Sequence, residues 1–254
     1  LEERQYEGAK PDVDLLLHFD RSPFLDAAET YRIDDSHSVR RTKKGRFGGG
    51  AAKFKKNEGG IHLIPKDGAL FGEQTLRHSF SMEFWLYPLH LDDGESLIHW
   101  EGHNTIGEPL HLQEIDASIE ERKLRWNFSN IFFSSDFEPR TVSLSGRTPL
   151  VPREWHHHLI RFDAQTGLLE YLVDGKPEAV RYVTDSGKVE GSVLRPYIGE
   201  SSRKQLVIGS DFNGYMDELR VLRDVVESPL LTPYSYTLGW TETTHIDLGD
   251  PGSE

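Results

Sequence analysis

Two short turn signals in the second half of the chain constrain its fold more than any other feature. Asp174-Gly175 follows the apolar, β-prone run Leu168–Val173. Asp-Gly is a strong signal for a β-hairpin, because a type I′ turn needs positive φ and glycine adopts it at little cost. Thr166-Gly167 marks a second turn just before the same run. The sequence therefore predicts a three-stranded meander over residues 155–183.

A further strand is predicted over residues 80–88. Its side chains alternate with the period of two that a sheet strand shows, and Pro88 ends it. One face would carry Phe80, Met82, Phe84 and Leu86, and the other Ser81, Glu83 and Trp85. Because the chain has 23 Gly, 13 Pro and no sustained apolar stripe at helical period, we expect an all-β fold with little helix.

Two motifs resemble the laminin-G-like members of the concanavalin A-like jelly rolls. One is the tryptophan-led segment from Trp155 to the hairpin at Asp174-Gly175, and the other is Gly214-Tyr-Met-Asp-Glu-Leu-Arg-Val221. The resemblance implies a two-sheet antiparallel β-sandwich in which the strand at residues 15–20 pairs with the late strand around 217–220. It sets the domain at residues 14–226, between a polar N-terminal segment (1–13) and an extended C-terminal tail (227–254). Such jelly rolls include sugar binders, adhesion modules, glycanases and structural parts, so the resemblance predicts a fold more than a function.

Composition argues against several functions. A formal net charge of −13 disfavours a nucleic-acid partner, since phosphate contacts need a basic face. The absence of cysteine leaves no disulfide and no thiolate metal site. No run approaches the roughly 20 apolar residues that a membrane-spanning helix needs. The chain starts at Leu1, which fits removal of a signal peptide or trimming, and the family resemblance favours an exported bacterial protein in the periplasm, outside the cell or at its surface.

One basic region contrasts with this acidic chain. Eight cations occur between residues 40 and 56 with no acid among them, and Phe47 and Phe54 lie within the run. One interpretation of the region is a docking patch for an acidic protein, an anionic glycan or an anionic membrane surface. The alternative is a solvated loop ahead of a strand near residues 51–54. The cations are Arg40, Arg41, Lys43, Lys44, Arg46, Lys53, Lys55 and Lys56.

The C-terminal tail adds aromatic residues to this prediction. Exposure of Tyr234, Tyr236 and Trp240 would leave apolar surface in contact with water. We therefore expect these side chains to lie on the domain or on another molecule. Together with the basic region they predict a non-catalytic structural module that docks other proteins in a surface or periplasmic assembly, such as a coat or filament sheath.

A carbohydrate-binding module is the first alternative. A sugar stacks its C–H face on an aromatic ring while its hydroxyls bind polar side chains. The segment Trp100–Asn104 offers such a set if Trp100 lies exposed on a rim. The predicted sugar-binding residues are Trp100, Glu101, His103 and Asn104.

A glycoside hydrolase is the second alternative. Glu114-Ile-Asp116 resembles the strand motif of the β-glucanases in the same superfamily, in which a second glutamate follows closely. A retaining mechanism needs two carboxylates about 5 Å apart. Here Glu120 comes too late, about 20 Å from Glu114 along a strand, and Glu120–Lys123 is predicted as a hairpin tip. We therefore predict no catalytic residues.

The sequence contains candidate ligands for two kinds of metal site. The run His156–His158 offers at most two ligands on one strand face, and zinc would need others such as His99, His103 or His111, so we favour structural roles. The resemblance implies a structural calcium where early and late strands meet, with Asp20 and Asp217 at the matching positions. The alternative is that Asp217 pairs locally or caps a turn.

Overall fold

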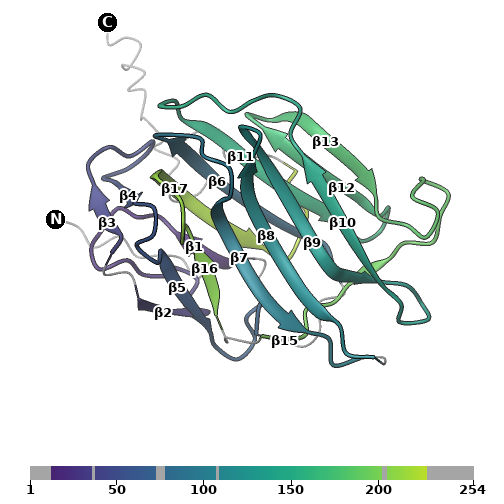
Figure 1. The fold of residues 1–254 in the computed structure, drawn as a ribbon. Coiled ribbons are helices and arrows are strands. Elements are labelled where there is room, and N and C mark those ends of the chain that lie inside the picture. The colour runs from purple at the N-terminus through teal and green to yellow at the C-terminus, as the bar shows by residue number, and fades with distance from the viewer. Residues whose placement is uncertain (1–12, 36–37, 73–77, 107–108, 202–204, 228–254) are drawn as a thin grey trace, which may run out of the picture.

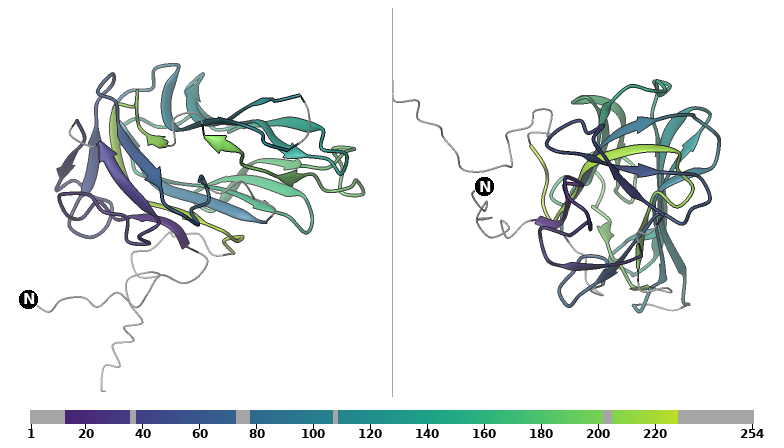
Figure 2. Two further views of the ribbon diagram at one scale, coloured as in Figure 1. Left: turned by 90° about the horizontal axis from the view of Figure 1, so that it is seen from below. Right: turned by 90° about the vertical axis from the view of Figure 1, so that its left-hand side faces the viewer.

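The computed structural model describes residues 13–35, 38–72, 78–106, 109–201 and 205–227. In these residues the chain forms two antiparallel sheets that lie face to face as two layers (Figures 1 and 2). No helix occurs in this part of the chain, and so none that could cross a membrane. The predicted all-β sandwich is confirmed.

The first sheet, sheet I, has eight strands in the order β13-β12-β11-β6-β17-β4-β3, with β1 paired to β17. The two ends of this order are β13 and the short β3. The strands are β1 (Val13–Leu17), β3 (Arg40–Thr42), β4 (Ala51–Phe54), β6 (Phe80–Pro88), β11 (His156–Asp163), β12 (Leu168–Val173), β13 (Lys176–Tyr182) and β17 (Gly214–Leu222).

The second sheet, sheet II, has nine strands in the order β10-β9-β8-β7-β16-β5-β2, with β14 paired to β9 and β15 to β7. Its strands are β2 (Tyr31–Asp35), β5 (Ile61–Pro65), β7 (Glu95–His103), β8 (Leu112–Glu120), β9 (Lys123–Phe133), β10 (Pro139–Ser145), β14 (Arg195–Pro196), β15 (Glu200–Ser201) and β16 (Leu206–Ile208).

The core lies between the two sheets and is rich in aromatic rings. From sheet I, Phe84 and Phe162 point inward, and Trp126 and Phe128 face them from sheet II, all without exposed surface. The Phe84 and Trp126 ring centroids lie 6.3 Å apart. Because the alternation of each strand places every second side chain in this layer, the other side chains form the two outer faces.

The local turn predictions are confirmed. Strands β11, β12 and β13 form the predicted meander, and both residues of the Asp174-Gly175 turn have positive φ, at 50° and 75°. Residues Glu121 and Arg122 likewise have positive φ and join β8 to β9, where a hairpin tip was predicted. Short-range turn chemistry therefore fixes these elements.

The long-range pairing that the resemblance implied is present as well. Strand β1 lies antiparallel to β17, with Leu15 opposite Val221 and Leu17 opposite Leu219. The described strands run from Val13 to Leu222. Tyr234, Tyr236 and Trp240 lie outside the described residues, so their docking role stays a prediction.

Candidate binding surface at the edge of sheet I

Most of the predicted basic region forms one hairpin at the edge of sheet I. Strand β3 is the last strand of the sheet and pairs with β4, with Arg40 opposite Lys53 (Figure 1). Residues 43–50 form the connecting loop, and Lys55 and Lys56 follow β4. We call residues 40–56 the basic hairpin. The sequence therefore predicted both the strand near residues 51–54 and the loop that precedes it.

Two buried or half-buried carboxylates hold the loop of the basic hairpin on the body of the domain. Asp217 accepts hydrogen bonds from the backbone N–H groups of Arg46, at 2.7 Å, and Phe47, at 2.9 Å. Asp20 accepts from the N–H groups of Gly49 and Gly50. These contacts join residues up to 171 positions apart, so the sequence alone gave no signal for them.

Gly48 completes this anchor. Its φ is +59°, and a Cβ there would lie 2.4 Å from both carboxylate oxygens of Asp20. A side chain at this position would therefore meet both backbone strain and a clash. Arg41 strengthens the same contact, because its Nε donates to the Asp20 carbonyl oxygen at 2.5 Å.

Asp20 and Asp217 are the two predicted calcium ligands, and their surroundings favour the loop-anchoring role. One oxygen of each carboxylate already accepts two backbone N–H groups, whereas calcium takes six to eight oxygen ligands. Among the described residues, no group of three or more His, Asp or Glu side chains could hold a metal ion. Asp20 and Asp217 alone do not supply that number of oxygen ligands, and the calcium site stays a prediction.

The Asp217 carboxylate is fully buried, and its burial has an electrostatic consequence. Burial raises the pKa of Asp217 to about 8, while the N–H donors of the loop oppose this rise. The neighbouring charges of Glu218 and Asp20 act in the same direction as burial. The strength of the loop anchor is therefore expected to depend on pH.

Most cations of the basic hairpin have no acidic partner. Lys55 pairs with Glu58 at 3.0 Å and Lys56 with Asp92 at 3.3 Å. The other six of the eight form no ion pair with a carboxylate in the described part of the chain. They are Arg40, Arg41, Lys43, Lys44, Arg46 and Lys53, and all but the half-buried Lys53 are exposed.

Aromatic rings lie under two of these cations. The guanidinium of Arg46 is 4.5 Å from the centre of the Trp85 ring, and Phe47 packs edge-on against the same ring at 5.3 Å. The ammonium of Lys44 is 3.8 Å from the centre of the Tyr87 ring. Cation–π contacts of this kind hold the charges over the outer face of sheet I.

The predicted sugar-binding set does not form a platform, and the expectation that Trp100 is exposed is wrong. Trp100 points into the core at 0% exposure and packs against Phe71. Asn104 is buried too and binds backbone groups of Ile106 and His111. The alternation of apolar Ile98 and Trp100 with polar His99 and Glu101 was the signal for an inward-facing tryptophan.

Glu101 and His103, the other two members of that set, lie half-buried on the outer face of sheet II. His103 Nε2 is 3.8 Å from Glu200 Oε2, and His99 Nε2 is 3.8 Å from Glu101 Oε2. These contacts are between neighbouring polar side chains of the sheet. Without Trp100, the predicted set has no tryptophan, tyrosine or phenylalanine ring on which a sugar could stack.

The carboxylates of β8 lie on the same face of sheet II. His99 Nδ1 is 3.5 Å from Asp116 and 3.8 Å from Glu114, and hydrogen bonding to Asp116 raises the pKa of His99. Glu120 pairs with Arg125 at 2.7 Å. The third carboxylate of the glucanase-like pattern is therefore engaged by a cation at the hairpin tip.

The three consecutive histidines have separate structural surroundings. His158 is in the core between the rings of Phe84 and Tyr171, and burial lowers its pKa to about 3. His157 faces outward and lies 3.0 Å from buried Glu83, whereas His156 contacts Asp174 at 2.7 Å. These contacts support the structural roles that the sequence favoured over zinc.

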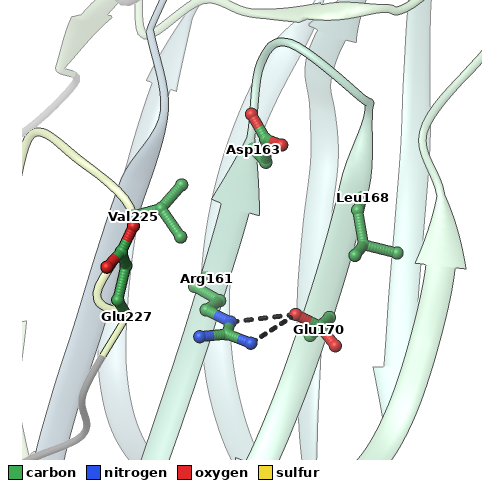
Figure 3. Close-up of a pocket in the computed structure, with 6 residues that line it drawn as sticks. All are labelled: Arg161, Asp163, Leu168, Glu170, Val225 and Glu227. Atoms are coloured by element: carbon green, nitrogen blue, oxygen red, sulfur yellow. Dashed lines mark hydrogen bonds and ion pairs between the residues drawn. The ribbon is translucent and has the colours of Figure 1, made fainter.

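Sequence reasoning missed a shallow pocket on the outer face of sheet I. It has a volume of about 340 Å³ and lies between β11, β12 and residues 225–227 (Figure 3). Arg161 crosses it, donating to Glu170 and to the carbonyl of Val226. None of the predicted site residues lines this pocket. Its lining residues are Arg161, Asp163, Leu168, Glu170, Val225 and Glu227.

The two packed antiparallel sheets, with the first and last strands paired, define a jelly-roll sandwich. The chain matches the family model of the concanavalin A-like lectin/glucanases superfamily over residues 65–229, and it belongs to this family. No curated protein matches the sequence.

Solved structures similar to the chain include binding domains of botulinum neurotoxins. The serotype G binding domain is 12% identical with a TM-score of 0.55, and the alignment covers 85% of this chain and 48% of that one. The DC binding domain, solved with rat synaptotagmin II, is 10% identical with a TM-score of 0.56, over 85% and 49% of the two chains. The chain thus spans about half the length of these neurotoxin domains.

Domain 4 of AbnA, an extracellular arabinanase from Geobacillus stearothermophilus solved with arabinotriose, is similar over nearly its whole length. It is 15% identical with a TM-score of 0.50, and the alignment covers 89% of this chain and 97% of that domain. At such low identities these likenesses show the fold alone.

Proposed function

We propose that this domain is a binding module without catalysis of its own, and that the basic hairpin docks an acidic partner protein in an assembly outside the cytoplasm. The observation that carries the proposal is the set of six hairpin cations without a carboxylate partner in the described residues, on a chain of net charge −13. Such a local reversal of charge steers and orients an acidic surface.

The structure of the hairpin supports a docking role over a solvated loop. Its loop is tied to the body through Asp20 and Asp217, and its cations lie over the rings of Trp85 and Tyr87. Because a fixed loop loses little conformational entropy on association, charges held in this way bind more strongly than charges on a mobile loop.

The structural neighbours agree with this class of function. They include a neurotoxin binding domain in complex with a protein, rat synaptotagmin II, and an arabinanase domain in complex with a sugar, arabinotriose. The fold is therefore known to serve as a binding scaffold, which supports a non-catalytic role at the level of analogy. The extracellular arabinanase also supports export of this chain.

The test compares two sets of charge reversals on opposite edges of sheet I. The hairpin variant carries Arg40→Glu, Lys43→Glu and Lys53→Glu. The control carries Lys176→Glu, Arg181→Glu and Lys188→Glu, which lie on β13 or just after it, are exposed and make the same change in net charge. Immobilised wild-type and variant domains are incubated with the envelope and extracellular fractions of the source.

We expect the wild type and the control to retain the same partner in stoichiometric amounts, and the hairpin variant to lose it. Retention should also fall as salt rises, because salt screens exposed charges over about 8–10 Å. A partner that the hairpin variant retains as well as the wild type would refute docking through the basic hairpin.

A further inference from the structure

Three aromatic side chains form a row on the outer face of sheet I, beside the basic hairpin. Tyr215 of β17 lies opposite Tyr87 of β6, and Tyr87 contacts Trp155, which directly precedes β11. The ring centroids of both pairs are 5.4 Å apart. We call Tyr215, Tyr87 and Trp155 the ring row; all three side chains are half-buried.

The ring row points away from the core. Met216 and Leu86, the neighbours of Tyr215 and Tyr87 in sequence, have no exposed surface and belong to the core between the sheets. Alternation along each strand therefore places the two tyrosine rings on the opposite, outer face.

Two cations continue the row toward the sheet edge. Lys53 of β4 lies opposite Tyr215, and Arg40 of β3 lies opposite Lys53. Since neighbouring strands are about 4.8 Å apart, the line from Arg40 to Trp155 extends for about 19 Å. The surface is thus a straight strip, with cations at one end and rings at the other.

Lys44 adds a charge directly over the rings. Its ammonium lies 3.8 Å from the Tyr87 ring centre and 5.1 Å from that of Tyr215, and it donates to the Tyr87 hydroxyl at 2.6 Å. An ammonium has three donors, and no described carboxylate accepts from this one. The rings therefore hold a cation in a fixed place where an anion can bind it.

We propose that this strip is a site for an anionic glycan, whose sugar rings pack on Tyr215 and Trp155 while its carboxylate or sulfate groups bind Lys44 and Lys53. A pyranose presents an apolar C–H face and polar hydroxyls, which match half-buried rings that carry hydroxyl and indole N–H groups. An acidic protein surface would need only the cations for binding and would not need the ring row. The site shares Lys44 and Lys53 with the proposed docking surface and adds the ring row, which docking does not require.

The experiment measures affinity for polygalacturonate, which is carboxylated, for heparin, which is sulfated, and for neutral dextran. We use the intact chain, the ring variants Trp155→Ala and Tyr215→Ala, and the charge variant Lys44→Gln. Matched controls on β13 are Tyr182→Ala, an exposed ring of the same sheet, and Lys176→Gln. Thermal unfolding of every variant checks the fold, and Lys44→Gln keeps the test valid if a ring variant unfolds, since Lys44 is exposed.

We expect one or both acidic polysaccharides to bind, dextran not to bind, and affinity to fall at least about tenfold in each ring variant and in Lys44→Gln, with both controls unchanged. Preference for polygalacturonate or heparin identifies the anionic group. The proposal is overturned if neither acidic polymer binds, if dextran binds equally, or if the ring variants bind like the wild type. In the last case charge alone holds the polymer, and docking of a protein by the basic hairpin still stands.

Discussion

Charged side chains on the two outer faces of the sandwich differ in burial and in pairing. On sheet I, Glu83, His157 and Arg220 are buried side by side, and six of the eight hairpin cations lack acidic partners in the described residues. On sheet II, Glu120 and Arg125 pair with each other while more than 40% of each side chain is exposed. Buried charges and unpaired charges affect the free energy of folding or binding more than exposed ion pairs do. We therefore expect function on the outer face of sheet I.

The largest difference between the faces should appear when one acid is removed from each. Glu83→Ala leaves Arg220 buried without this acidic partner, and we expect it to lower the free energy of unfolding by about 3–5 kcal/mol. Glu120→Ala removes an exposed partner and should cost about 0–1 kcal/mol. Urea unfolding of both variants measures the two values, and equal losses would contradict the contrast between the faces.

The loop anchor should give the next largest effect. Asp217→Ala removes the acceptor of two backbone N–H groups, and we expect a loss of about 2–3 kcal/mol in unfolding free energy. Asp217→Asn keeps one acceptor oxygen, so its loss of unfolding free energy should be smaller. If urea unfolding shows that Ala and Asn variants are equally stable, Asp217 does not hold the loop through these bonds.

The same residue predicts a dependence of stability on pH. The pKa of Asp217 is about 8 in the folded protein and about 4 in an unfolded chain, so between these values the unfolded state loses its proton first. The contribution of Asp217 to stability therefore falls as pH rises from about 4 to about 8 and stays low above it. Asp217→Asn should flatten this part of the stability curve, and Asp136→Asn, an exposed control, should leave it unchanged.

On sheet II, His99 should give a weaker pH effect, in which the fold stabilises the charged form of the side chain. The raised pKa of His99 means that its protonated form is stabilised by Asp116 in the fold, so this contribution is present below about pH 6.5 and is lost as pH rises through the folded value. Because His99 is partly exposed, Asp116→Asn should lower the free energy of unfolding by less than about 1 kcal/mol at pH 5.5, and by less still at pH 8. A larger loss at pH 8 than at pH 5.5 would contradict this assignment.

The smallest expected effect has an informative sign. Lys43→Gln removes an exposed cation that repels its neighbours in the basic hairpin, so stability should stay the same or rise by up to about 0.5 kcal/mol. Arg125→Gln on sheet II removes a paired cation and should lower stability slightly. Thermal unfolding at low salt compares them, and a clear loss in Lys43→Gln would indicate an acidic partner within the chain.

Sequence reasoning succeeded where the determining interactions are local. The turn at Asp174-Gly175 and the hairpin tip at Glu120–Lys123 depend on a few adjacent residues, and the resemblance supplied the pairing of β1 with β17. It failed for Trp100, although the local alternation of Ile98 and Trp100 with His99 and Glu101 indicated a side chain that faces the core. It also failed for the partners of Asp20 and Asp217, because they come from a loop far away in sequence.

The candidate site was predictable only in part. The eight cations of the basic hairpin are adjacent in sequence and were named from it, but the absence of acidic partners for six of them depends on the packing of the whole domain. The ring row could not be predicted, since Tyr87, Trp155 and Tyr215 come together only through the order of β11, β6 and β17 in sheet I.

The most direct test of the central claim is retention of the intact chain on a cation-exchange resin at pH 7 and low salt. A protein of net charge −13 should pass through such a resin unless a local basic surface binds it. We predict that the wild type and the β13 control with Lys176→Glu, Arg181→Glu and Lys188→Glu are retarded, and that the hairpin variant with Arg40→Glu, Lys43→Glu and Lys53→Glu passes through unretarded. Passage of the wild type with the void volume, or equal retardation of the hairpin variant, would contradict the account.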